Sequence, residues 1–430
     1  MERDAPGLSP SLDDVDRAGP ACPGWVRQAG PVVLFLAIAL HLATEAIWFL
    51  AYSRQVDMQV FRFAGVSLVR GAPLYEAGLN GQRDSLLFNY PPFAAAVFSP
   101  LALFPVDQLR LVVPFLNLAV LAAAIRRCLQ ALGIRGGWEL RSLTMLGTGS
   151  LLWLEPVRTT IILGQINLVL LAIVVFDLLP STTQRGWRGV GVGVAAGIKL
   201  TPLLFIPFLL LTGRVRAAAI AGGTFVATVA FGFAIAPSQA QRYWLRGTFD
   251  DVRRIGPINS TGNESLRGLV GRIGMSATTT TLVWVLAAAL LAGASLAVAA
   301  FADRRGEDVL AVAICGLASA AVAPFAWGYH WVWFVPLAVV LGERAIVRGS
   351  RASAILLGAL WVATASWITG WRPPASGMMP PAGVMTLTSG GWPGLLTRNI
   401  YVVALVATLI LTVARGRPIE SRDGSAPVPA

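Results

Sequence analysis

The sequence predicts an all-α polytopic membrane protein, and three observations lead to this prediction. Hydrophobic residues make up 55% of the 430 positions and charged residues 13%, about half the charged share of an ordinary soluble domain. The apolar residues gather in long runs such as 31–51, 282–301 and 354–368, each near the length that crosses a hydrocarbon core of about 30 Å as a helix. The runs lack the two-residue alternation of barrel strands, so helices are left as the structure that satisfies its backbone in lipid.

About twelve apolar segments are candidate crossings. They are 31–51, 109–125, 142–158, 161–180, 189–200, 202–212, 217–237, 281–300, 308–326, 331–342, 353–369 and 399–414. A further stretch, 93–104, is bracketed by prolines, and we interpret it as a half-helix dipping from the outer face, because a full crossing there would break the parity. Residues 189–200 span about 18 Å as a helix, too short to cross, so 189–212 is either a re-entrant pair or one helix kinked at Pro202.

The arginines give these segments a direction, because cytoplasmic loops carry an excess of positive charge. Twelve crossings place Arg27, Arg126, Arg127, Arg135, Arg141, Arg185, Arg188, Arg214, Arg216, Arg304, Arg305, Arg344, Arg348, Arg351, Arg415 and Arg417 on one side. Lys199 is the only lysine, a bias typical of a GC-rich bacterial genome. We therefore expect a multi-pass protein of a bacterial inner (plasma) membrane, with outer loops near 53–92, 238–280 and 370–398 and outer turns near 155–165, 199–201 and 327–330.

The chain is expected to form one membrane domain, 28–415, between disordered cytoplasmic tails at 1–27 and 416–430. The net charge of +12 would suggest nucleic acid in a soluble protein. Here it is better explained by arginines that set topology and meet anionic lipid head groups, so no nucleic-acid partner is expected. The three cysteines and two histidines lack metal-ligand spacing, and the sequence has no ATP-binding P-loop and no GxSxG elbow.

Polar residues in the outer segments are the candidates for chemistry. Asp57, just beyond the first segment, could take a proton from an attacking hydroxyl, or it could be an interfacial acid paired with Arg54 or Arg62. Tyr90 opens a rigid Tyr-Pro-Pro-Phe turn, which is equally explained as a plain helix start with proline in its first turn. Glu155 and Arg158 stand together at the next outer turn.

Amides and cations at membrane depth are expensive unless they bind something. Gln165 and Asn167 could hold sugar hydroxyls, or they could hydrogen-bond neighbouring helices. Lys199 lies in an apolar stretch, where a lysine costs about 2.5–3.5 kcal/mol on insertion scales, and a phosphate ligand would relieve that cost. His330 lies among aromatic residues and could donate to a phosphate or orient a carboxylate. It could equally be one member of an interfacial aromatic cluster.

The loop 238–280 is unusually basic for an outer loop. It holds Asn263 and six arginines, namely Arg242, Arg246, Arg253, Arg254, Arg267 and Arg272. Long loops are exempt from the positive-inside rule. Either an anionic acceptor or phosphate, or a merely basic surface, would explain the charge.

Seven short motifs in register carry a family resemblance over about residues 31–415. They are Asp57 with Phe61-Arg62, Gly71-x-x-Leu-Tyr75, Tyr90-Pro-Pro-Phe93 before Pro100-Leu, Gly164-Gln-Ile-Asn167, Ile198-Lys199-Leu-Thr-Pro202, Asn263-Glu-Ser-Leu-Arg-Gly268 and Trp327-x-x-His330-Trp-Val-Trp333. In these the sequence resembles the polyprenol-phosphate-mannose-dependent mannosyltransferases of actinobacteria, glycosyltransferase family 87 of the GT-C superfamily. The resemblance implies a GT-C type transmembrane helical bundle with short re-entrant or interfacial helices in the first outer loop.

The resemblance also implies roles for individual residues. Asp57 would be the catalytic base and His330 the histidine of the aromatic motif, although Tyr329 stands where the family usually has Ser or His. Donor or acceptor binding would fall to Arg62, Tyr90, Glu155, Arg158, Gln165, Asn167, Lys199, Asn263, Arg267 and Trp327.

The implied reaction is a single displacement with inversion on the periplasmic side, the activity of a hexosyltransferase. Mannose would pass from a polyprenyl-phosphate-mannose donor to a phosphatidylinositol mannoside, lipomannan or lipoarabinomannan acceptor, forming an α-1,2 linkage. Lys199, Arg267 or His330 would meet the charge of the departing phosphate. Neither a cofactor nor a metal is expected, and the protein is expected to be a monomer in contact with membrane lipids.

Three other functions stay open at this point. A polyprenyl-phosphate-arabinofuranose donor would suit the same architecture. A lipid or sugar transporter or flippase predicts inverted repeats and charged residues at mid-membrane on several helices, and a non-catalytic assembly subunit would tolerate loss of Asp57.

Overall fold

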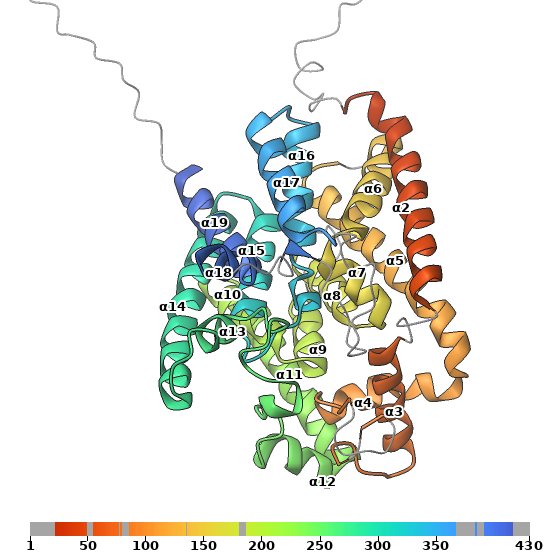
Figure 1. Cartoon of the computed structure of the whole chain (residues 1–430), viewed down its shortest axis with the longest axis vertical. Coiled ribbons are helices and arrows are strands. Elements are labelled where there is room, and N and C mark those ends of the chain that lie inside the picture. Colours follow the sequence, from red (N-terminus) through yellow and green to blue (C-terminus); the bar gives the residue numbers. More distant parts are fainter. Residues whose placement is uncertain are drawn as a thin grey trace, which may run out of the picture.

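The computed structural model describes residues 22–49, 55–76, 78–79, 86–134, 136–179, 186–366, 383–384 and 391–415. Most of the expected tail 1–27, all of 416–430 and most of the expected outer loop 370–398 lie outside the described residues. Within them, the regular structure is helical, apart from one isolated bridge between Leu154 and Ala365. The all-helical prediction is confirmed (Figure 1).

The helices carry the labels of Figure 1. In chain order they are α2 (Trp25–Phe49), α3 (Val56–Val69), α4 (Pro92–Phe98), α5 (Val106–Ala131), α6 (Gly137–Leu152), α7 (Glu155–Leu163), α8 (Asn167–Leu178), α9 (Val190–Ile198), α10 (Phe205–Leu211), α11 (Val215–Ile235), α12 (Pro237–Ala240), α13 (Leu266–Gly271), α14 (Ala277–Arg304), α15 (Asp308–Val322), α16 (Phe334–Ile346), α17 (Arg351–Thr364), α18 (Gly391–Thr397) and α19 (Ile400–Arg415). Short turns of other helix types are η1 (Ser99–Leu103), η2 (Thr201–Leu204), η3 (Gln241–Leu245), η4 (Val252–Arg254) and η5 (Gly328–Trp331).

Several helices have the length and composition of membrane spans. These are the 25–44 part of α2 together with α5, α11 and α14, and the bent pair α7–α8 would add a fifth. Shorter apolar helices are α4–η1, η2–α10, α15, α17 and α19. The chain is thus a multi-pass membrane protein, and about twelve crossings stay a prediction.

Two predicted crossings, 142–158 and 161–180, have the wrong boundaries. The segment 142–158 divides, because α6 ends at Leu152 and a separate helix, α7, starts at Glu155. The α7 axis is bent by 117° from that of α8. Gly164 ends α7 with a φ of +71°, a conformation open to glycine at little steric cost. This turn, which we placed partly in a crossing, presents Gln165 and Asn167.

Of the two alternatives for 189–212, the single helix kinked at Pro202 is wrong, because the stretch divides into α9 and η2–α10. α9 ends at Ile198, Lys199 is extended with φ −148° and ψ 131°, and η2 begins at Thr201. The break therefore precedes Pro202, which sits in the first turn of η2, where its missing N–H is not needed. The predicted half-helix at 93–104 is present as α4 and η1.

Glycines allow α2 and α6 to pack closely. A Cβ added at Gly149 would lie 2.8 Å from the Cα of Leu34, and one added at Gly30 would overlap the carbonyl oxygen of Ser142. Small residues at such crossings let backbones approach, which is how helices gain packing energy within lipid. The first helix is thereby tied to the helix that leads into α7.

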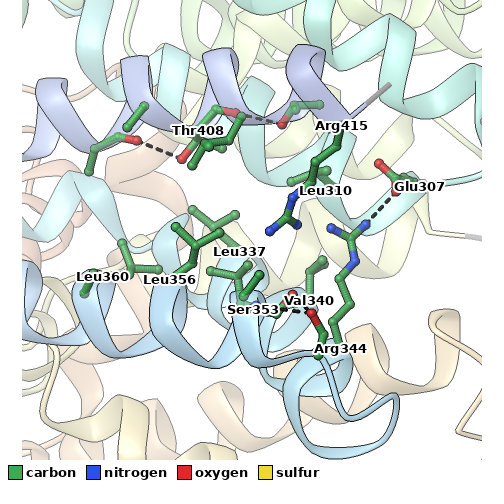
Figure 2. Close-up of a pocket in the computed structure, with 18 of the residues that line it drawn as sticks. Glu307, Leu310, Leu337, Val340, Arg344, Ser353, Leu356, Leu360, Thr408 and Arg415 are labelled. Atoms are coloured by element: carbon green, nitrogen blue, oxygen red, sulfur yellow. Dashed lines mark hydrogen bonds and ion pairs between the residues drawn. The ribbon is translucent and has the colours of Figure 1, made fainter. Parts of the chain in front are cut away.

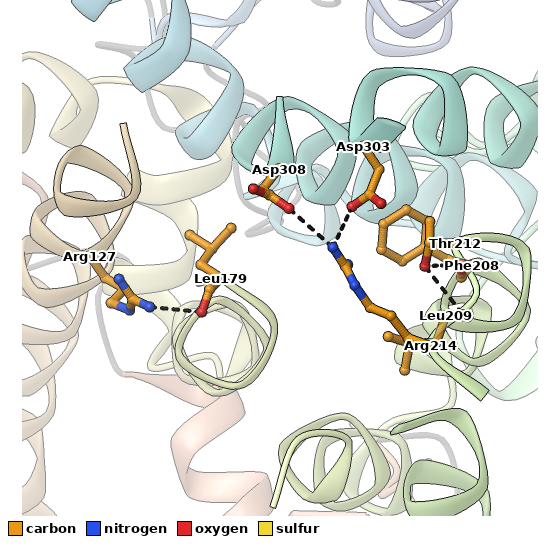
Figure 3. A network of polar contacts seen from close by, with 8 residues as sticks. All are labelled: Arg127, Leu179, Phe208, Leu209, Thr212, Arg214, Asp303 and Asp308. Atoms are coloured by element: carbon orange, nitrogen blue, oxygen red, sulfur yellow. Dashed lines mark hydrogen bonds and ion pairs between the residues drawn. The ribbon is translucent and has the colours of Figure 1, made fainter. Parts of the chain in front are cut away.

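Two arginines that we assigned to cytoplasmic connections also bind the fold together (Figure 3). Arg214, just before α11, lies 2.8 Å from Asp303 and 3.2 Å from Asp308, at the α14–α15 turn. Arg127 donates to the carbonyl oxygen of Leu179 at 2.8 Å, one of the carbonyls that a helix C-terminus leaves unpaired. The α10–α11 and α14–α15 connections therefore meet at one end of the bundle.

The two ends of the molecule carry different elements. Figure 1 shows α3, α4 and α12 together at the lower end, whereas α2 begins and the α16–α17 hairpin turns at the upper end. The first and second expected outer loops thus share an end that is opposite to one of the arginine-bearing turns.

Candidate active site

Gln55 anchors the start of α3. Its side-chain amide donates to the carbonyl oxygens of Ile161 at 2.8 Å and Ile162 at 3.1 Å, near the C-terminal end of α7, where carbonyls lack helical partners. Its φ is +48°, an unusual conformation for a residue other than glycine and one found at functional sites. This anchor fixes the position of Asp57, two residues further on.

Asp57 faces the turn between α7 and α8. The Gln165 side chain hydrogen-bonds the carboxyl group, and the charge of Lys199 acts on it. One carboxyl oxygen, Oδ2, is buried without a hydrogen-bond partner in the described part of the chain. Burial raises the pKa of Asp57 to about 6, while Gln165 and Lys199 both lower it. The group is therefore mostly ionised at pH 7 and still able to accept a proton, as a general base requires.

A chain of polar contacts joins the α7–α8 turn to the end of α9. Lys199 Nζ donates to Oδ1 of Asn167 at 2.9 Å, and the amide of Asn167 lies 3.4 Å from Oε1 of Gln165. Tyr90 donates to the same Gln165 oxygen at 3.4 Å. Three segments that are distant from Asp57 in sequence thus converge on it.

Aromatic rings enclose the Lys199 ammonium group. Its Nζ lies 5.5 Å from the centroid of the Tyr90 ring and 5.6 Å from that of Tyr329, distances typical of cation–π contacts. Tyr329 in turn stacks on His330, with ring centroids 4.9 Å apart. The tyrosine that departs from the family pattern therefore forms part of the wall beside Lys199.

His330 is held in one tautomer. Its Nδ1 lies 3.1 Å from the carbonyl oxygen of Trp327, which can only accept a hydrogen bond. Burial and the charge of Lys199 hold the pKa of His330 well below its usual value. The ring is then neutral with its proton on Nδ1, so Nε2 is free to accept a hydrogen bond from a substrate hydroxyl.

Two buried acids, Glu155 and Glu264, lie close to this cluster. Glu155, the first residue of α7, accepts hydrogen bonds from Tyr401 at 2.6 Å and Thr159 at 2.7 Å. Glu264 is 1% exposed, and neither of its carboxyl oxygens has a partner in the described residues. Burial and then the charge of Glu155 raise the pKa of Glu264 well above its usual value, although Arg272 opposes this.

Gly328 leaves room for the Glu155 carboxylate. A Cβ at this position would overlap both carboxylate oxygens. Because η5 carries Gly328 and His330 together, the acid at the start of α7 and the histidine are placed by one short turn.

Two other predicted site residues, Arg62 and Arg158, form hydrogen bonds to other parts of the protein. Arg62 donates to the carbonyl oxygen of Phe104 and so joins α3 to η1 rather than pairing with Asp57. Arg158 contacts Thr44 at 2.8 Å and Ser366 at 3.2 Å.

The predicted site residues of the second outer loop mainly make contacts within the protein. Asn263 donates to the Ile258 carbonyl and accepts from Ser265 and the Ala326 backbone, so its amide holds this loop against the Pro324–His330 segment. Arg267 stacks on Trp284, away from the Asp57 cluster. Trp327 packs on Phe325 and touches the site through its carbonyl bond to His330.

Three of the six loop arginines also bond within the protein. Arg242 pairs with Glu76 at 2.6 Å, and Arg254 donates to the carbonyl of Tyr75 at 2.9 Å, which ties the second loop to the first. Arg272 donates to the carbonyls of Ser260 and Asn263 and to the side chain of Asn399.

Sequence reasoning missed Gln55, Glu264 and Tyr401. Gln55 lies two residues before Asp57, and Glu264 directly follows Asn263. For Glu264, an acid in a loop that contains glycine and asparagine was a usable signal. Tyr401 carried no such signal, because it belongs to an apolar helix. Among the described residues, no group of three or more His, Cys, Asp and Glu side chains could hold a metal ion.

Comparison with known proteins identifies the family of this chain. The family model for glycosyltransferase family 87 matches residues 88–324. The chain belongs to this family and is a glycosyltransferase.

Curated relatives extend the match over nearly the whole chain. A protein of Mycobacterium tuberculosis is 32% identical over 416 residues, covering 93% of this chain and 90% of its own length. A protein of Mycolicibacterium smegmatis is 32% identical over 89% of this chain and 91% of its own length. Both are named polyprenol-phosphate-mannose-dependent alpha-(1-2)-phosphatidylinositol pentamannoside mannosyltransferase. A second M. tuberculosis protein, 29% identical over 70% of this chain and 73% of its own length, is named for a phosphatidylinositol mannoside acceptor.

Proposed function

We propose that this protein transfers mannose, with inversion, from polyprenyl-phosphate-mannose to a phosphatidylinositol mannoside and forms an α-1,2 linkage. The observation that carries the proposal is the convergence of Asp57, Lys199 and His330 from three distant segments in a family of lipid-dependent mannosyltransferases. The relatives that match along nearly their whole length are named for a pentamannoside acceptor, which favours a phosphatidylinositol mannoside over lipomannan or lipoarabinomannan.

Asp57 is the catalytic base in this proposal. A hydroxyl of the acceptor mannose gives its proton to the buried Oδ2, and its oxygen forms a bond to the anomeric carbon of the donor. The bond from that carbon to the phosphate oxygen breaks on the opposite face, and both of its electrons leave with the polyprenyl phosphate. Gln165 stabilises the anionic form of Asp57 by hydrogen bonding. Nε2 of neutral His330 accepts a hydrogen bond from a second hydroxyl of the acceptor sugar.

Lys199 meets the phosphate. Its ammonium group lies near Asp57 and between the rings of Tyr90 and Tyr329. When Asp57 takes the acceptor proton it becomes neutral, and the phosphate then supplies the counter-charge of Lys199. Neutral His330 offers no proton on Nε2, and Arg267 stacks on a tryptophan elsewhere. Of the three candidates Lys199, Arg267 and His330, we therefore assign stabilisation of the departing phosphate charge to Lys199.

The other substrate-binding roles follow from position. Tyr90, Gln165 and Asn167 form the wall shared by base and phosphate, and they bind donor hydroxyls. Glu155, which lies beside Gly328, and Glu264 contact the acceptor sugar. Arg62, Arg158, Asn263, Arg267 and Trp327 position these elements.

We also propose that the protein is a monomer that crosses the membrane about twelve times in a defined orientation. The cluster lies on the periplasmic face, because the arginine-bearing short connections belong to the cytoplasmic face. The lipid phosphate is a fair leaving group, so we propose that the enzyme needs no cofactor beyond its lipid-linked donor. Transfer that stops on chelation of divalent metal would contradict this point.

One assay tests donor, base and acceptor together. Membranes carrying wild type or Asp57→Asn receive radiolabelled polyprenyl-phosphate-mannose or polyprenyl-phosphate-arabinofuranose with phosphatidylinositol mannosides of defined length. We expect mannose transfer by wild type and a loss of about 10²–10⁴-fold in Asp57→Asn, the contribution of a general base. Asp107→Asn is the matched control, because Asp107 is 88% exposed and pairs with Arg110. Arabinose transfer, or near-wild-type transfer by Asp57→Asn, refutes the proposal.

A further inference from the structure

A long slot runs between α16, α17 and α19, apart from the catalytic cluster. Its volume is about 590 Å³, within the range of ligand-binding pockets. Figure 2 shows Leu356 and Leu360 toward one end of the slot and Arg344 and Arg415 toward the other. The slot is therefore apolar at one end and positively charged at the other.

Small side chains on the facing helices create this space. Ala359 and Ala363 of α17 face Ala404 and Ala407 of α19 across the slot. Alanine leaves a gap where leucine or phenylalanine would fill the space between neighbouring helices. Ala359 and Ala407 are exposed, so the gap opens to the surroundings of the bundle.

Four arginines surround the charged end, and their charge exceeds that of the acids there. Arg344 pairs with Glu307 at 2.6 Å and Arg348 with Glu343 at 2.8 Å. Arg305 lies over the ring of Phe301. Arg305 and Arg415 are both exposed, and neither has a carboxylate partner among the residues described.

The slot is long enough for an acyl chain. From Ile400 to Arg415, both lining residues, α19 advances about 22 Å at 1.5 Å per residue. One leaflet contributes about half of a hydrocarbon core of about 30 Å. A single chain can therefore lie along the slot with its head group beside the arginines.

We propose that this slot binds an anionic glycerophospholipid, with one acyl chain against α17 and α19 and the phosphate at Arg305 and Arg415. Charge identifies the occupant: a neutral lipid or an apolar protein helix would leave the two arginines without a counter-ion. The site is separate from the catalytic one, because Tyr401, which binds Glu155, lies 14 residues before Arg415 on α19, about 21 Å along the helix. The lipid therefore supports the helices behind the active site and is not a substrate.

The test measures lipid retained by the purified full-length protein after reconstitution in phosphatidylcholine nanodiscs that also contain phosphatidylglycerol. Native mass spectrometry counts bound molecules of each lipid. Two surface arginines contribute about 1 kcal/mol each to binding an anionic lipid, so we expect R305Q/R415Q to lower the preference for phosphatidylglycerol roughly 30-fold. A359W should fill the slot and reduce retention of both lipids.

Matched variants separate the slot from the general surface. R351Q removes an exposed arginine of α17 that does not line the slot, and A354W adds bulk on an exposed position outside it; both should retain lipid as wild type does. Unchanged preference in R305Q/R415Q, or unchanged retention in A359W, overturns the proposal. A dimer that A359W converts to a monomer would assign the slot to a second copy of the chain instead.

Discussion

Replacing Lys199 separates two effects of one charge. Lys199 lowers the pKa of Asp57, which is about 6 in the intact site, and in our mechanism it also stabilises the departing phosphate. Lys199→Met removes both effects. An opposite charge at short range lowers the pKa of a carboxyl by about 1–3 units, so we expect the acid limb of the pH–rate profile to move upward by at least about one unit.

The magnitudes of the two effects differ. At pH 7, a base with a pKa near 6 is about 90% ionised, and raising the pKa to about 7 leaves about 50%. Lost ionisation thus accounts for about a twofold decrease in rate. Removal of a preorganised group that meets developing negative charge costs about 10²–10³-fold. Burial lowers the pKa of Lys199 to about 7 in the free protein, and a bound donor phosphate raises it again. The loss therefore persists on the high-pH plateau of kcat, where the donor is bound and Asp57 is ionised in either protein.

The assay is mannose transfer from the lipid donor, measured as kcat against pH from about 5 to about 9. Lys199→Arg is the matched control, because it keeps the charge and changes the geometry. We expect it to lower the plateau and leave the acid limb in place. An acid limb at the same pH in Lys199→Met and Lys199→Arg would refute the claim that Lys199 tunes Asp57. A wild-type plateau in Lys199→Met would refute its role at the phosphate.

Three further predictions concern the residues around this pair. Gln55→Ala should lower kcat about tenfold with little change in donor KM, because α3 loses its two bonds to α7; a wild-type kcat would contradict the anchoring role. Glu264→Gln should stabilise the protein above neutral pH. The folded carboxyl binds its proton more tightly than the unfolded one, so wild-type stability is greatest below about pH 4.5 and falls as pH rises toward the folded pKa; equal pH dependence of thermal unfolding in both proteins would contradict this. Gly328→Ala should abolish transfer, because the added methyl group overlaps the Glu155 carboxylate, and the matched change Gly358→Ala, with open space around it, should not.

Much of the site could be predicted because its residues break a strong local rule. A lysine or an amide in an apolar segment is expensive, so Lys199, Gln165 and Asn167 stood out without any knowledge of their neighbours. The same rule predicted that the outer turns would hold the chemistry, and the structure joins those turns through the bond from Lys199 to Asn167.

The remaining errors came from contacts that sequence does not reveal. Composition alone made 142–158 look like a single crossing, because α7 is short and apolar enough to merge with α6. The bend of 117° between α7 and α8 depends on Gly164 and on Gln55, which binds the end of α7 from a hundred residues earlier. A tyrosine such as Tyr401 cannot be recognised as the partner of Glu155 until α19 is packed beside α7.

The arginines show why charge alone is a poor guide to a phosphate site. The second outer loop seemed rich in candidate ligands, yet Arg242, Arg254 and Arg272 donate to a carboxylate, to backbone carbonyls and to amide oxygens of the protein. A planar guanidinium with five donors suits such structural bonds. A lysine is a compact charge on a flexible stem, and Lys199 donates to the neutral side-chain amide of Asn167. Asp57 is the acid whose charge acts on this ammonium group. In our mechanism Asp57 becomes neutral when it takes the acceptor proton, so the departing phosphate then supplies the counter-charge of Lys199.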